Sequence, residues 1–136
     1  MCKKRNINSE IVANYSLSLW NQYKPYVQAC ISDSFAATES LILGSLILLP
    51  RHCDCVLNAV TPSHFTNQLF QRVATICYSD IRNYGEVNVQ MLLNRLNDSP
   101  LCHTYEIQDN IQSIQQTVTD QVDEHLIAGA VLEMMS

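Results

Sequence analysis

Apolar side chains recur every three or four residues along most of the chain, which is the spacing of one face of an α-helix. Two adjacent apolar rows share one long helix over residues 65–84, and Gly85 follows where a left-handed residue commonly ends a helix. Residues 35–49 are apolar on most sides and stop at Pro50, so we expect this helix at the centre of the core. No segment alternates apolar and polar residues over the length of a strand. The pattern predicts an all-α fold.

Breaks in the pattern divide the rest of the chain into shorter helices. Ser9 can cap a first helix, and Pro25 is expected to interrupt it because proline lacks an amide N–H and disfavours helical geometry in the residue before it. A short second piece over residues 25–31 follows, then further helices over residues 52–60 and from a cap at Asn88. The apolar positions of the first helix are Ile11, Tyr15, Leu19 and Tyr23.

The C-terminal segment has the most regular pattern. Apolar residues over 107–118 are spaced four, three and four apart, like a coiled-coil seam, and a second set over 122–134 repeats every four. Two narrow stripes joined by a short turn indicate a helical hairpin. Such a seam either meets a partner or second copy, or packs only within the chain. The candidate interface residues on it are Ile107, Ile111, Ile114, Val118, Val122, Leu126, Val131 and Met134.

The same pattern gives a domain organisation. We expect an N-terminal helical extension (residues 1–34), a compact helical bundle (35–100) and the C-terminal helical hairpin (101–136). In the extension Trp20 and Tyr23 are expected to be exposed and are further candidate partner contacts.

Composition and charge narrow the class of partner. The chain has 136 residues, which suits one domain, and 47% of them are hydrophobic, enough for a core. Acids outnumber bases 13 to 8, so we expect no direct binding to nucleic acid. Residues 96–136 contain acids and no lysine or arginine, which is either a solvated face or a docking surface for a basic protein.

Targeting signals are not visible in the sequence. The polar start has no apolar signal region, and the longest apolar stretch, residues 41–49, is too short to span a membrane. Several of the six cysteines lie among apolar residues, where cysteine behaves as a small buried hydrophobe. We therefore expect a reduced, cytoplasmic protein without a membrane partner.

Sequence motifs for catalysis or cofactor binding are missing. Three glycines in all exclude a phosphate-binding P-loop, and the signatures of acyl transfer, zinc proteolysis and dinucleotide binding are absent. His52, Cys53 and Cys55 lie close together, with Cys77 and residues 102–103 as further donors. A C-x-C pair without a second pair is a poor zinc motif, so we expect no metal, no cofactor and no enzyme activity.

Five motifs stand in a definite order in the middle of the chain. They are residues 37–48 (ATESLILGSLIL), residues 57–65 (LNAVTPSHF), the group Phe70, Val73 and Ala74, residues 85–88 (GEVN), and the pair Leu92 and Leu96. In this order they resemble the N-terminal domain of DnaB-type replicative DNA helicases. The resemblance covers residues 36–100 well and residues 105–135 loosely, where that family has a helical hairpin.

The resemblance implies a non-catalytic domain, because the motor of those helicases is a separate RecA-like unit. In that family the domain dimerises into a collar and contacts primase and, in some systems, loaders. The chain is thus expected to be a stand-alone adaptor, encoded by a phage or other mobile element, that binds a replicative helicase, primase or loader, or forms a homodimer or higher homo-oligomer. The alternative is a regulatory module that reuses the scaffold, such as an antirepressor that binds a transcription factor.

Overall fold

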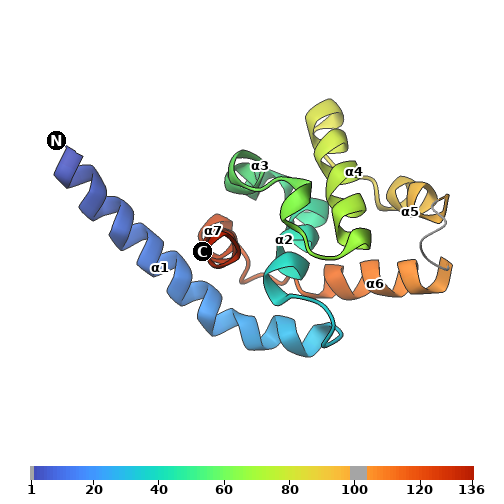
Figure 1. The fold of residues 1–136 in the computed structure, drawn as a ribbon, viewed down its shortest axis with the longest axis horizontal. Helices are drawn as coiled ribbons and strands as arrows, with labels where there is room; N and C mark the ends of the chain where they lie inside the picture. Colours follow the sequence, from blue (N-terminus) through green and yellow to red (C-terminus); the bar gives the residue numbers. More distant parts are fainter. Residues whose placement is uncertain (1, 99–103) are drawn as a thin grey trace.

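A computed structural model (Figure 1) describes the backbone of residues 2–98 and 104–136, and the side chains of residues 10–98 and 106–136. Within these ranges all regular structure is helical, which confirms the all-α prediction. The helices are α1 (Cys2–Cys30), α2 (Ala37–Leu48), the 3₁₀ turn η1 (Pro50–His52), α3 (Asp54–Ala59), the 3₁₀ turn η2 (Pro62–His64), α4 (Gln68–Tyr84), α5 (Val89–Asn97), α6 (Thr104–Gln116) and α7 (Glu124–Met135).

Helix α2 is the centre of the molecule, as its apolar sequence predicts. Every residue from Leu41 to Ile47 is buried, and the helix packs against α1, α4, α6 and α7 (Figure 1). Gly44 permits a close approach of α6, because a Cβ there would lie 2.5 Å from the carbonyl oxygen of Ile114. The neighbouring helices are therefore arranged around α2.

The N-terminal helix differs from its prediction. Helix α1 is continuous, with Pro25 inside it and Ser9 within its first half rather than at a cap. Proline costs one backbone hydrogen bond, and contacts on both sides of Pro25 offset that loss. The Tyr23 hydroxyl donates to the carbonyl of Thr117, and the Tyr26 hydroxyl donates to the carbonyl of Gln116 over 3.1 Å.

Local signals set the ends of α4 and α5. The side chain of Asn67 accepts hydrogen bonds from two backbone amides of the first turn of α4, as expected for an N-cap. Gly85 ends that helix with φ of 77°, the left-handed conformation that glycine adopts at little cost. Asn88 then caps α5 by accepting from the amide of Met91. The predictions for Gly85 and Asn88 are confirmed.

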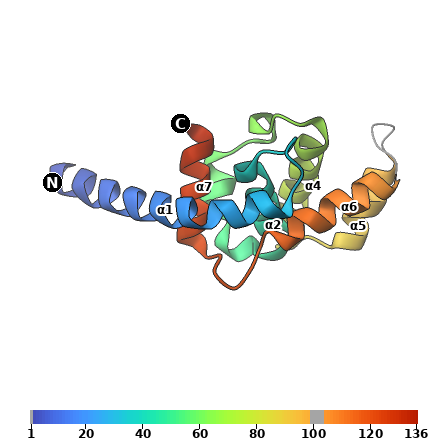
Figure 2. The same ribbon diagram turned by 90° about the horizontal axis from the view of Figure 1, so that it is seen from below.

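The last two helices do not form a closed hairpin. Figure 1 shows α7 end-on while α6 lies across the view, and Figure 2 shows α7 upright and α6 inclined, with α2 between them. Helix α6 packs mainly against α2 and α5, and α7 packs mainly against α1, α2 and α3. The physical reason is that α7 is apolar on more than one side, with adjacent Leu126 and Ile127 both buried, so one antiparallel neighbour cannot cover it.

The three parts expected from the sequence share one core. A single hydrophobic cluster of the described residues includes Trp20 of α1, Ile42 of α2, Ile111 of α6 and Val131 of α7. The second half of α1 and helices α6 and α7 therefore contribute to the same core as the helices between them.

Candidate interaction surface

The candidate seam residues of the C-terminal segment lie inside the chain. Six of them are buried, namely Ile107, Ile111, Ile114, Val122, Leu126 and Val131. The other two, Val118 and Met134, are partly buried and pack against the same core. The structure therefore shows the intramolecular alternative for these residues, and they do not form an open contact surface.

The expectation that Trp20 and Tyr23 are exposed is wrong. Trp20 is fully buried, and Tyr23 is nearly so, with its hydroxyl oxygen also 3.0 Å from the hydroxyl of Thr119. Both stand on the face of α1 that packs against α7 and the preceding turn. Helical spacing places them on one face, but the cover for that face comes from residues about a hundred positions later in the chain.

The first half of α1 extends beyond the body of the protein (Figures 1 and 2). It carries three large hydrophobic side chains that are mostly in solvent: Ile11 is 61% exposed, Val12 is 52% exposed and Tyr15 is 54% exposed. The Tyr15 ring meets the ring of His125 edge to face, with centroids 5.7 Å apart. Neighbouring exposed apolar side chains are a feature of contact surfaces.

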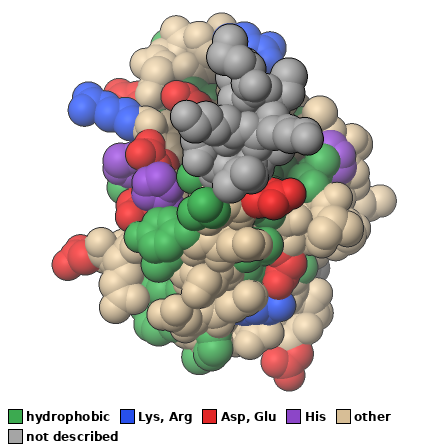
Figure 3. Space-filling model, turned by 90° about the vertical axis from the view of Figure 1, so that its left-hand side faces the viewer, with side chains coloured by type: hydrophobic (Ala, Val, Ile, Leu, Met, Phe, Trp, Pro, Cys, Tyr) green, Lys and Arg blue, Asp and Glu red, His purple; other side chains and the backbone are tan. Residues whose placement is uncertain are grey.

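An apolar groove adjoins these side chains. It lies between α1, α3 and α7 and has a volume of about 510 Å³. Figure 3 views the molecule from this end and shows hydrophobic side chains gathered on this face. Most of the lining is small, which allows a helix to approach closely. The lining residues are Val12, Ala13, Ser16, Cys55, Ala59, Ala128, Val131 and Leu132.

One polar group in the groove has no partner. The Ser16 hydroxyl is buried, and it makes no hydrogen bond within the described part of the chain. An unpaired buried hydroxyl costs about 1–3 kcal/mol. The backbone at Ser16 packs directly on α7, since a Cβ on Gly129 would lie 2.1 Å from the Ser16 carbonyl oxygen. Ser16 is therefore held in place at the floor of the groove.

Acidic residues stand near Cys55, one of the residues that line the groove. Burial raises the pKa of the Cys55 thiol, and the nearby carboxylates of Asp54 and Glu124 raise it further. Both acids are exposed. A thiol with a raised pKa is a poor nucleophile at neutral pH. The groove thus offers apolar contact and negative charge rather than covalent chemistry.

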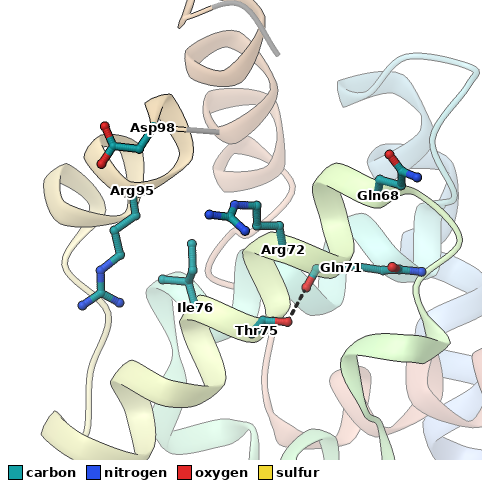
Figure 4. A pocket seen from close by; sticks show the side chains of 7 residues that line it. All are labelled: Gln68, Gln71, Arg72, Thr75, Ile76, Arg95 and Asp98. Carbon is teal, nitrogen blue, oxygen red and sulfur yellow. Dashed lines mark hydrogen bonds between the residues drawn. The ribbon is translucent and has the colours of Figure 1, made fainter. Parts of the chain in front are cut away.

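Helices α4 and α5 border a second, polar groove of about 640 Å³ (Figure 4). Figure 4 shows Arg72 directed from α4 toward α5, and Thr75 donating to the Gln71 carbonyl over 2.8 Å. Arg95 in this groove also pairs with the buried Asp80 over 3.2 Å. That pair neutralises a buried carboxylate, so a structural role accounts for Arg95.

The cysteine and histidine cluster does not form a metal centre among the described residues. No group of three or more metal-binding side chains comes together there. Cys53 is buried and its thiol donates to the Leu49 carbonyl over 3.2 Å, while His52 is exposed. The expected further donors at 102–103 lie outside the described residues.

The raised pKa values of two buried thiols predict that the protein loses stability at high pH. Burial is the main cause that raises the pKa of Cys53 and of Cys77 to about 12. An unfolded thiol ionises near pH 8.5, so above that pH the unfolded state binds fewer protons than the folded state. The contribution of the two thiols to the free energy of unfolding is therefore complete below about pH 8.5. It is lost as the pH rises from about 9 to 12. We expect the free energy of unfolding to fall by up to about 1.4 kcal/mol per pH unit per thiol.

Urea denaturation at a series of pH values from neutral to alkaline measures this loss. Cys77→Ala is the control, because it should remove about half of the thiol contribution and leave the rest of the titration unchanged. The prediction would be contradicted by a free energy of unfolding that does not change with pH in this range. It would also be contradicted if the free energy of unfolding of Cys77→Ala falls with pH as steeply as that of the wild type.

No protein-family model, no curated protein and no solved structure matches the chain. In the described ranges, none of the helices combines the length and the apolar character needed to cross a membrane.

The candidate surface also includes Val12 and the small residues of the groove, which the sequence pattern did not single out. Ile11 and Tyr15 were placed on the apolar face of the first helix, but spacing alone treated that whole face as equally covered.

Proposed function

We propose that the protein is a non-catalytic interaction module that binds another protein through the surface formed by α1, α3 and α7. The observation that carries this proposal is the exposed apolar edge of α1, with Ile11, Val12 and Tyr15, beside an apolar groove. Burial of apolar surface by a partner removes it from water and is therefore favourable.

The identity of the partner is proposed from the sequence resemblance. Five motifs on residues 36–100 resemble the N-terminal domain of replicative helicases, and an all-α fold is compatible with that domain. The proposed function is therefore that of a stand-alone adaptor of phage or mobile-element origin, which acts in the cytoplasm on DNA replication. Its partners would be a replicative helicase, primase or loader, or further copies of itself.

A pull-down from native lysate with mass spectrometry tests this proposal. Val12→Glu places a charge at the edge of the groove on a half-exposed side chain, so the fold should be retained while the partner is lost. Met91→Glu is the matched control, since Met91 on α5 is 50% exposed and lies outside the groove. Recovery of replication proteins by the wild type and the control, but not by Val12→Glu, is the expected result.

Other outcomes of the pull-down would change the proposed function or the proposed surface. Recovery of a transcriptional repressor in place of replication proteins would favour the antirepressor alternative. Equal recovery by Val12→Glu and the wild type would overturn the assignment of the contact surface, and no specific recovery together with a monomeric wild type would overturn the function.

A further inference from the structure

We propose that Tyr23 and Tyr26 of α1 form a latch on the end of α6, which is closed while their hydroxyl groups are protonated and opens when the hydroxyls lose their protons. The latch consists of these two side chains and the carbonyl groups of Gln116 and Thr117 that accept from them. It is a conformational device separate from the proposed contact surface, because none of its residues lines the groove or belongs to the exposed edge of α1.

The end of α6 needs hydrogen-bond donors from elsewhere in the chain. The last carbonyl groups of a helix have no amide of a following turn to accept from. At the end of α6 the carbonyl of Ile114 accepts from the Thr117 amide over 3.2 Å, and the carbonyl of Gln115 accepts from the Val118 amide over 3.2 Å. The carbonyls of Gln116 and Thr117 instead accept from side chains of α1. Helix α1 therefore completes the end of α6.

The donors of α1 stand on one face of that helix. Tyr23, Tyr26 and Cys30 are three and four residues apart, which places neighbouring side chains on the same side. The Tyr26 hydroxyl donates to the Gln116 carbonyl over 3.1 Å, and the Cys30 thiol donates to the same carbonyl over 3.8 Å. The Tyr23 hydroxyl donates to the Thr117 carbonyl, and the rings of the two tyrosines lie 5.4 Å apart.

Ionisation of either tyrosine would reverse its contact. A tyrosine hydroxyl can donate only while it is protonated, and a phenolate can only accept. When the Tyr26 proton is lost to hydroxide, the phenolate oxygen faces the Gln116 carbonyl oxygen with no proton between them. The phenolate also stands at the C-terminal end of α6, where the helix dipole is negative. Attraction between the two helices at this point thus becomes repulsion.

The surroundings of the two hydroxyls favour their protonated forms. Burial is the main cause that raises the pKa of Tyr23, and hydrogen bonds with Thr119 lower it in part. The neighbouring Cys30 is the main cause that raises the pKa of Tyr26. An unfolded tyrosine ionises near pH 10, so the folded state holds these two protons more tightly than the unfolded state. The contribution of the latch to stability is therefore complete below about pH 10 and is lost above it.

Charged groups on the neighbouring elements are few. On α7, Glu133 faces this part of α1 and is paired with Lys24, whose Nζ lies 3.1 Å from both carboxylate oxygens. In the turn after α6, the titratable side chain nearest in sequence is the exposed Asp120. Both carboxylates are already ionised well below pH 10. The protons that change as the latch opens are therefore those of the two tyrosines and of Cys30.

Opening of the latch would affect α1 at its weakest point. Pro25 lies between the two tyrosines and lacks the amide N–H that a helix interior normally uses, so this turn has one backbone hydrogen bond fewer. The contacts with α6 support the helix there. Without them α1 is free to bend at Pro25, and the end of α6 is free to fray. The latch thus couples the protonation of two tyrosines to the shape of α1.

Hydrogen exchange of the full chain at neutral pH tests the contacts of the latch. In the double variant Tyr23→Phe/Tyr26→Phe, amides of residues 27–30 and 114–119 should exchange at least about fivefold faster than in the wild type, the factor expected for the net loss of two hydrogen bonds. Tyr84→Phe is the matched control, because Tyr84 is 70% exposed and lies outside the latch, and it should leave these rates unchanged. Unchanged rates in the double variant would overturn the latch.

Urea denaturation between pH 9 and 12 tests the dependence on protonation. The equilibrium constant for unfolding should rise above about pH 10 by up to tenfold per pH unit for each tyrosine of the latch. The double variant should lose this part of the rise, and Tyr84→Phe should keep it. The buried thiols titrate in all three proteins and cancel in the comparison. A rise as steep in the double variant as in the wild type would overturn the opening by loss of the hydroxyl protons.

Discussion

Ile111→Asp is expected to unfold the protein rather than to release a folded monomer. Ile111 is buried in α6, within the cluster of side chains that surrounds α2. The substitution removes the burial of a large aliphatic side chain, worth about 1.5–3 kcal/mol. It also places a carboxylate in an apolar site without a charged partner, which costs several kcal/mol more even when the group becomes protonated.

The expected loss is comparable with the whole stability of a small domain. Native domains are stable by about 5–15 kcal/mol, so most of the Ile111→Asp chain should be unfolded or aggregated at neutral pH. Circular dichroism and urea denaturation measure this result directly. Partial recovery at acidic pH is expected as well, because protonation removes the buried charge.

The control for this prediction is the neighbouring residue. Gln112→Asp adds the same charge one position later, on an exposed side chain, and should change the free energy of unfolding by less than about 0.5 kcal/mol. A folded Ile111→Asp monomer with the helical spectrum of the wild type would contradict the intramolecular packing and restore α6 as an intermolecular seam.

Gly129→Ala is expected to destabilise the protein by about 3 kcal/mol, toward the upper end of the usual cost of overpacking. An added Cβ would lie 2.1 Å from the Ser16 carbonyl oxygen and 2.8 Å from the Cβ of Trp20. The first of these atoms belongs to a helix backbone, which cannot rotate aside as a flexible side chain does. Helices α1 and α7 would have to separate, and Trp20 would lose part of its packing.

The sign of the stability change in Gly129→Ala distinguishes close packing from helix propensity. Alanine is the better helix former by about 1 kcal/mol, so helix propensity alone predicts that Gly129→Ala stabilises α7. Thermal and urea denaturation should instead show that Gly129→Ala is less stable than the wild type. The pair Asn21→Ala and Asn21→Gly, at an exposed position in the interior of α1, is the control that measures propensity without close packing. Asn21→Gly should be less stable than Asn21→Ala by about 1 kcal/mol.

Equal or increased stability of Gly129→Ala would mean that α1 and α7 do not meet as closely as the structure places them. The groove lies between these two helices and α3, so that result would also remove the basis for the proposed contact surface. The prediction thus tests the packing on which the functional proposals depend.

The amino-acid sequence alone determined the features that depend on near neighbours. Asn67 and Asn88 as caps and Gly85 as a helix end act through hydrogen bonds or backbone geometry within a few residues. The central position of α2 was also predictable, because a helix that is apolar on most sides must be covered on most sides.

Tertiary structure decided which faces of the helices are covered and by what. The sequence pattern treated Pro25 as a break, yet long-range contacts such as the Tyr23 hydroxyl with the Thr117 carbonyl hold α1 in one piece. Packing against α7 likewise buries Trp20. Ile11, earlier in the same helix, has no such neighbour and stays exposed. Helical periodicity records only which residues share a face, whereas burial depends on residues that are distant in sequence and adjacent only in the folded chain.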